Sequence, residues 1–148
     1  MSFLFNWVLL VMFSVTTKGL YGAQALIEMA VRKDEGVLQL KDLSEKCGIP
    51  KNYLEQLFNL LRKAGIVSSL RGNKGGYVLA KEASEISMLE ILEALEGPVE
   101  ISKNIEFSGA LRKVFNQTEQ TIKNCFSVSL ADLAVQEMQL KENVTFYI

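Results

Sequence analysis

The chain has 148 residues, 49% apolar and 22% charged with a net charge of −1, a composition typical of one globular domain and unlike that of a disordered chain. It contains no histidine, which removes histidine-based acid–base and metal chemistry, and its two cysteines are too few for a disulfide framework or a four-cysteine metal site. We therefore expect a cytoplasmic non-enzyme without catalytic residues, metal ligands or a cofactor.

Residues 1–13 are strongly apolar, but they are shorter than the roughly 20 residues that a membrane-spanning helix requires. They also lack the basic start and the small-residue cleavage site of a signal peptide. We interpret residues 1–11 as an extension upstream of the domain, arising from a mis-chosen start codon, with a membrane anchor as the alternative. No membrane partner is expected.

A first helix is predicted after Thr16 or Thr17, either of which can cap it. It should end at Asp34-Glu35-Gly36, which break the helical pattern. Its apolar residues recur at helical spacing and should pack under the next two helices: Leu20, Ala23, Ile27, Ala30 and Val31.

Residues 39–64 have the spacing of a helix-turn-helix. Leu40, Leu43 and Cys47 form the apolar stripe of a short helix, Gly48 supplies a turn, and Pro50 takes the first position of a second helix. The second helix has an apolar stripe of Leu54, Leu57, Phe58 and Leu61. Its opposite face carries Asn52, Glu55, Gln56, Asn59 and Lys63. These side chains can contact base edges in a major groove, although a solvated surface would look the same.

A β-hairpin is predicted directly after this second helix. A β-branched run at 66–69 leads into a glycine-rich basic turn at 70–76 and then into Tyr77-Val78-Leu79. Arg71 and Lys74 at the tip suit a minor groove or a phosphate backbone, because glycines allow close approach. The distribution of charge also favours DNA binding by this half of the chain. Residues 1–81 hold 11 Lys+Arg against 6 Asp+Glu, whereas residues 82–148 hold 5 Lys+Arg against 11 Asp+Glu.

A short helix should follow the hairpin, with Ser87 and Glu90 forming a capping box and Ile86 packing on Ile91. Its stripe is Met88, Ile91, Leu92 and Leu95, and Gly97-Pro98 should end it. The glutamates at 90, 93, 96 and 100 could suggest acid–base or metal chemistry. We interpret them as a solvated face.

A longer helix is predicted from Ser108, with an apolar stripe that too little of its own chain remains to cover, so a partner chain is the expected cover. The stripe consists of Leu111, Val114, Phe115, Thr118, Ile122, Cys125 and Phe126. Ser129 and Asp132 should begin a short last helix containing Leu130, Leu133 and Ala134, followed by an extended tail at 144–148.

Several of these motifs together resemble the Rrf2 family of bacterial transcription regulators, from about Ser14 to the C-terminus. The matching residues are Lys18-Gly19-x-Tyr21, Tyr53-Leu54-Glu55-Gln56-Leu57, Leu61-Arg62-Lys63-Ala64-Gly65-Ile66-Val67, Arg71-Gly72-x-Lys74-Gly75-Gly76-Tyr77 and Leu95-Glu96-Gly97. The resemblance implies a mainly α fold with a small β-hairpin wing. Residues 12–97 would form a winged helix-turn-helix domain, and 98–148 a linker, a long dimerisation helix and a C-terminal tail.

The resemblance implies a homodimeric regulator, a repressor, that binds a pseudo-palindromic operator in double-stranded DNA. It gives Glu55 and Gln56 base-edge roles. Tyr21 could instead be a core-edge aromatic, and Arg62 could turn towards the protein. The complete set of expected DNA contacts is Lys18, Tyr21, Asn52, Tyr53, Glu55, Gln56, Asn59, Arg62, Lys63, Arg71, Gly72 and Lys74.

Cluster-binding members of the family carry three cysteines in the loop that corresponds to Pro98–Ser108, and this loop has none. Thiolates are the ligands that an iron–sulfur cluster needs. We therefore expect no cluster, as in the family's cluster-free CymR branch. Two alternatives stay open: a thiol-based redox-sensing regulator that uses Cys47 or Cys125, and a winged-helix protein-interaction module. The effector, a protein or a small molecule, is unknown.

Overall fold

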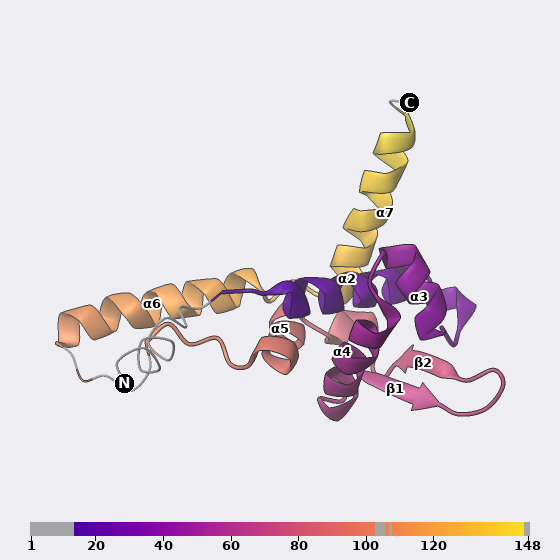
Figure 1. Cartoon of the computed structure of the whole chain (residues 1–148). Helices are drawn as coiled ribbons and strands as arrows, with labels where there is room; N and C mark the ends of the chain where they lie inside the picture. The colour runs from indigo at the N-terminus through magenta and orange to yellow at the C-terminus, as the bar shows by residue number, and fades with distance from the viewer. Residues whose placement is uncertain (1–13, 103–105, 107, 147–148) are drawn as a thin grey trace.

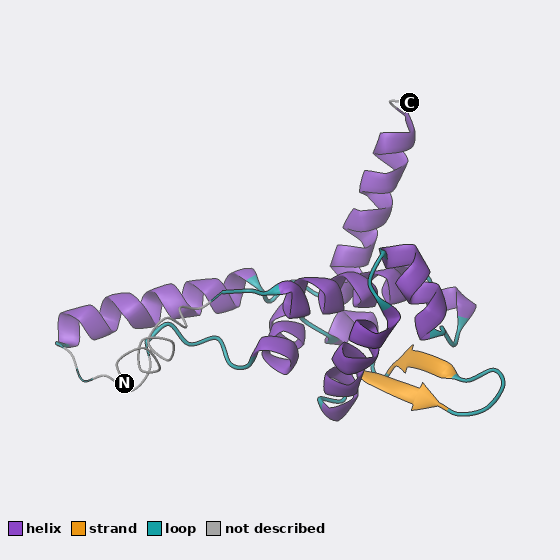
Figure 2. Ribbon diagram, in the orientation of Figure 1, coloured by secondary structure: helices purple, strands orange, loops and turns teal. Residues whose placement is uncertain are grey.

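The structure is a computed structural model that describes residues 14–102, 106 and 108–146. Its described part is mainly helical, with one antiparallel two-stranded hairpin (Figures 1 and 2), so the predicted fold class is confirmed. In chain order the elements are α2 (Thr17–Val31), η1 (Lys33–Glu35), α3 (Leu40–Cys47), α4 (Lys51–Lys63), β1 (Val67–Leu70), β2 (Gly76–Leu79), η2 (Ala83–Glu85), α5 (Met88–Glu96), α6 (Gly109–Cys125) and α7 (Leu130–Phe146).

The core lies between α2, α3, α4 and α5. The stripe predicted for α4 is buried, with Leu54, Leu57, Phe58 and Leu61 each at most 1% exposed. These side chains pack with Leu26 of α2 and with the apolar faces of the other two helices. Burying each large apolar side chain stabilises the fold by about 1.5–3 kcal/mol, so the stripe determines which face of α4 points outwards.

The turn between α3 and α4 uses Gly48 in the left-handed conformation, with φ of 67°. The Ser44 hydroxyl donates to the Ile49 carbonyl at 2.6 Å, which closes the turn. Pro50 stands one position earlier than predicted: it precedes the first helical residue, because its ψ of 132° is extended rather than helical. Its carbonyl still accepts the first helical hydrogen bond, from the Leu54 amide at 3.0 Å.

The hairpin pairs Val67 with Leu79 and Leu70 with Gly76 at its two ends. A third segment joins it, since Leu38 and Tyr77 exchange backbone hydrogen bonds of 3.0 and 2.8 Å. A side chain at Gly76 would collide with the Leu38 carbonyl, so this close approach requires glycine. The Tyr77 ring packs edge-to-face on Phe58, with ring centres 4.9 Å apart. The wing is thereby fixed to α4.

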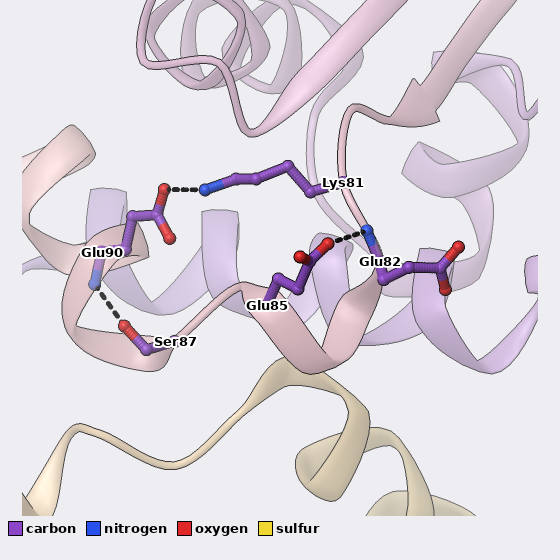
Figure 3. A network of polar contacts seen from close by, with 5 residues as sticks. All are labelled: Lys81, Glu82, Glu85, Ser87 and Glu90. Carbon is purple, nitrogen blue, oxygen red and sulfur yellow. Dashed lines mark hydrogen bonds and ion pairs between the residues drawn. The ribbon is translucent and has the colours of Figure 1, made fainter.

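The start of α5 is capped as predicted on one side only (Figure 3). The Ser87 hydroxyl accepts from the Glu90 amide at 3.1 Å, but the Glu90 carboxylate turns away and pairs with Lys81 at 2.6 Å. The reciprocal capping box of this segment forms at η2 instead, between Glu82 and Glu85. The Lys81–Glu90 pair links the end of the wing to α5.

Helices α6 and α7 extend from the body in two different directions (Figure 1). The turn between them is held against α5 by backbone hydrogen bonds from Met88 to Val128, at 2.9 Å, and from Leu89 to Phe126, at 2.7 Å. The Ser129 hydroxyl caps α7 as expected, accepting from the Asp132 amide at 3.1 Å.

The short last helix and extended tail predicted for the C-terminus are wrong over the described residues. Helix α7 continues to Phe146, because the segment after Ala134 is rich in Gln, Glu, Met, Leu and Lys, which favour helix. Leu130 and Ala134 are buried against the domain, while the later turns are exposed. Within the ranges that the structure describes, no helix is both long and apolar enough to cross a membrane. The apolar segment 1–13 lies outside those ranges.

Candidate nucleic-acid interface

The outer face of α4 is a continuous polar surface. Every residue predicted for it is exposed, and Arg62 is exposed as well rather than turned towards the protein. Two contacts order this face: Lys51 Nζ lies 3.8 Å from a Glu55 carboxylate oxygen, and the Arg62 guanidinium donates to the Asn59 amide oxygen at 3.4 Å. Asn52 and Gln56 keep amide groups that can both donate and accept towards a ligand.

The start of α2 lies beside the start of α4. The rings of Tyr21 and Tyr53 meet edge-to-face with centres 6.1 Å apart, and Thr17 Oγ1 lies 3.4 Å from the Tyr53 hydroxyl. Tyr21 is exposed on the surface, and Lys18 is exposed one turn earlier. The structure therefore brings Tyr21 of α2 into contact with α4 through Tyr53, and Lys18 lies one turn before Tyr21 on the same helix.

The wing carries its two basic residues on the loop between β1 and β2. Arg71, Gly72 and Lys74 are exposed, and Figure 2 shows this loop extending beyond the helices. Gly72 has a φ of 110°, which side chains rarely adopt, and a side chain at Gly75 would meet the Leu70 carbonyl. The sharp turn that presents Arg71 and Lys74 thus depends on these glycines.

Glu96 is the residue of this region that the sequence interpretation missed. The sequence predicts a solvated position for Glu96, but one of its carboxylate oxygens accepts three hydrogen bonds from the start of α2: from the Thr16 amide at 2.8 Å, the Thr16 hydroxyl at 2.6 Å and the Gly19 amide at 2.9 Å. Burial pushes the pKa of Glu96 upwards, but these hydrogen bonds outweigh burial and place the pKa below its usual value.

The apolar stripe of α6 is largely open to solvent in the part of the chain that the structure describes. Helix α6 contains no buried residue; Leu111, Val114 and Phe115 are 52%, 57% and 37% exposed. Thr118 and Cys125 are also exposed, whereas Ile122 and Phe126 near the anchored end are half-buried. Several large apolar side chains on one projecting helix form a surface of the kind that proteins normally cover with a partner.

The two cysteines lie in different environments. Cys47 packs at the edge of the core of α3, as predicted, and burial, assisted by the nearby Glu28 carboxylate, raises the pKa of its thiol. A raised pKa makes Cys47 a poor thiolate nucleophile, which argues against a redox role for it. Cys125 is exposed at the end of α6.

A cavity of about 570 Å³ lies behind the wing, between the end of α2, strand β2 and helix α7. Its lining mixes apolar and charged residues, among them Met29, Leu38, Leu79 and Met138 and also Lys33, Asp34, Lys81 and Glu82. None of the residues predicted to contact DNA lines it.

A protein-family model described as "Rrf2: Iron-dependent Transcriptional regulator" matches residues 15–136. Among curated proteins, the chain is 46% identical over 89 residues to the HTH-type transcriptional regulator IscR of Photorhabdus laumondii and 44% identical over 89 residues to IscR of Escherichia coli. These alignments cover 60% of this chain and 54% and 55% of the two relatives. The chain thus spans about half the length of the curated relatives it matches.

Solved structures resemble the chain over a larger share of its length. One is CymR, described as the global cysteine regulator of B. subtilis, with a TM-score of 0.77 and 37% identity, covering 84% of this chain and 98% of that one. Another is T. potens IscR, with a TM-score of 0.71 and 38% identity, covering 84% and 88%. CymR of Staphylococcus aureus gives a TM-score of 0.67 and 36% identity, covering 80% and 96%.

Proposed function

The chain belongs to the Rrf2 family of transcriptional regulators, and from this premise we propose that it is a cytoplasmic repressor that binds a pseudo-palindromic operator as a homodimer, without an iron–sulfur cluster. Residues 12–97 would form the DNA-binding domain. Residues 98–148 would supply the linker, the dimerisation helix and a C-terminal helix in place of the expected tail.

The observation that carries the proposal is the exposed polar face of α4, flanked by an exposed basic wing on one side and by Lys18 and Tyr21 on the other. Gln56 and Asn52 would pair with base edges in a major groove, and Glu55 would accept from a cytosine amino group. Tyr53, Asn59, Arg62, Lys63 and Lys74 would hold phosphates. Arg71 would enter the flanking minor groove, where negative potential attracts arginine.

The open stripe of α6 supports the homodimer. Two copies that cover each other's stripe would remove it from water and would place two α4 helices in successive major grooves, roughly 34 Å apart. This geometry requires an operator with twofold sequence symmetry.

The family's description mentions iron, and the donor set of this chain does not fit a cluster. The sequence offers two cysteines, one of them half-buried with a raised thiol pKa, and neither lies in the loop at 98–108. Among the described residues, no three His, Cys, Asp or Glu side chains are grouped so as to hold a metal. Soft thiolate ligands are what an iron–sulfur cluster requires.

Selection of genomic DNA fragments by the purified chain tests the proposal. We expect enrichment of one pseudo-palindromic sequence that a dimer binds. A DNA in which the two half-sites are scrambled should not be bound. Failure to enrich any sequence, together with capture of no duplex DNA, would favour the protein-interaction alternative, in which the polar face of α4 docks a protein.

A further inference from the structure

The carboxylate of Glu96 joins the end of α5 to the start of α2. We propose that Glu96 is a positioning residue for DNA binding: it fixes the first turn of α2 so that Lys18 and Tyr21 reach the DNA backbone. The inference rests on the proposed DNA-binding function and adds a residue that touches no DNA itself.

The three hydrogen bonds of Glu96 hold both ends of the first turn of α2. Thr16 is its N-cap and gives a backbone and a hydroxyl bond; Gly19, three residues on, gives the third. Lys18 lies between these two residues in the chain, so its backbone position is fixed by the three hydrogen bonds, which we call the Glu96 clamp. The Thr16 hydroxyl also accepts from the Lys18 amide at 3.3 Å, which extends the network to the lysine itself.

Close packing of α2 on α5 leaves this clamp little freedom. A side chain at Gly19 would lie 3.0 Å from the Glu96 carboxylate and 3.0 Å from Leu92, and one at Gly22 would collide with Leu95. The two helices therefore approach closely because these glycines permit it. Rotation of the first turn of α2 would break the Glu96 hydrogen bonds.

The first turn of α2, which the Glu96 clamp holds, also contacts α4. Thr17 Oγ1 lies 3.4 Å from the Tyr53 hydroxyl, and Tyr53 packs on Tyr21. Displacement of the first turn of α2 would move Lys18 away from the DNA phosphates and would loosen the Tyr21–Tyr53 contact at the start of α4. The loss should therefore be a loss of phosphate contacts, which carry the salt dependence of binding.

All three donors meet the same oxygen, and this allows a matched pair of variants. Glu96→Gln keeps an acceptor oxygen at that place and removes the charge; Glu96→Met removes the charge and the acceptor while keeping the length of the side chain. Both variants lose the negative charge that repels DNA, so the difference between them reports the hydrogen bonds alone.

We would titrate full-length Glu96→Gln, Glu96→Met and Lys18→Ala, and the double variant Lys18→Ala/Glu96→Met, with an operator selected by the wild type, at several salt concentrations. Glu96→Gln should bind at least as well as the wild type. Glu96→Met should bind about three- to tenfold more weakly than Glu96→Gln, and its plot of log affinity against log salt should be shallower by about 2, because one phosphate contact is lost on each chain of the dimer. The double variant should bind the operator no more weakly than the weaker of the two single variants, because both substitutions remove the same contact of Lys18 with DNA.

Thermal unfolding and sedimentation of each variant test whether the substitution only harms folding or assembly. If Glu96→Met does not fold, Thr16→Val replaces it, since it removes one of the three hydrogen bonds to Glu96. A salt slope unchanged by Glu96→Met and by Thr16→Val, or additive effects of Lys18→Ala and Glu96→Met, would overturn the inference. If the wild type itself selects no DNA, the proposed function fails. If the wild type binds DNA and the variants have the same salt slope as the wild type, the proposed function stands and only the role of Glu96 is refuted.

Discussion

Lys141 of α7 reaches across to Glu28 of α2, with its Nζ 3.3 Å from a carboxylate oxygen of Glu28. Glu28 is the charged residue of the described core, with its side chain 9% exposed, whereas the lysine side chain is 50% exposed. A nearly buried carboxylate requires a partner, and the long C-terminal helix supplies one. The pair therefore holds α7 against α2.

Replacing Lys141 by Met should destabilise the fold by about 1–2 kcal/mol, less than for a fully buried pair because the lysine is half exposed. Chemical denaturation measures this loss. The double variant Glu28→Gln/Lys141→Met should recover most of it, since no uncompensated charge remains. A single variant as stable as the wild type would mean that the pair does not hold α7.

Replacing Arg71 by Ala should weaken operator binding by about 1–3 kcal/mol, most strongly where the flanking minor groove is narrow. The side chain is exposed on the wing loop, so the fold should be unaffected. Asn73→Ala, a neutral change on the same loop, is the matched control. Full-strength binding by the arginine variant would remove the wing from the mechanism.

Replacing Val114 by Asp should dissociate the dimer, because an unpaired carboxylate would be buried in the interface at a cost of several kcal/mol. Val114 is 57% exposed in the single chain, so the monomer should still fold. Asn116→Asp places the same charge on the opposite side of α6. Sedimentation that finds the valine variant dimeric, like the asparagine control, would show that α6 is not the interface.

Acid should selectively weaken the contribution of Glu96. Its pKa is lowered in the folded chain relative to the ordinary value of 4.5, so ionisation favours folding: the contribution is present above that value and is lost as pH falls through the folded pKa. The difference in free energy of unfolding between the wild type and Glu96→Gln should shrink as pH is lowered below about 4.5. Urea unfolding at several pH values measures it, and a constant difference would contradict the assigned shift.

Much of this fold could be predicted because each element has a strong local signal. The α4 stripe has helical spacing, Gly48 and the wing glycines mark turns, and the Ser87 hydroxyl accepts the amide expected of its cap. Most residues predicted for DNA contact lie on one amphipathic face, which sequence periodicity locates, or on one basic loop, whereas Lys18 and Tyr21 of α2 come from the family resemblance.

The failures concern contacts between segments distant in sequence. The glutamates at 90, 93 and 96 have the spacing of a solvated helix face, but Glu90 pairs with Lys81, and Glu96 binds Thr16 and Gly19, 80 and 77 positions earlier. The close fit of Gly22 against Leu95 has no local signature either. The length of α7 was missed because burial stops after Ala134 while helix propensity continues.

The salt dependence of binding to mixed duplex DNA tests the central claim most directly. A dimer that neutralises several phosphates through Lys18, Arg62, Lys63 and Lys74 on each chain should lose orders of magnitude in affinity between about 50 and 200 mM salt. An affinity that stays flat over this range would contradict DNA binding through α4 and the wing.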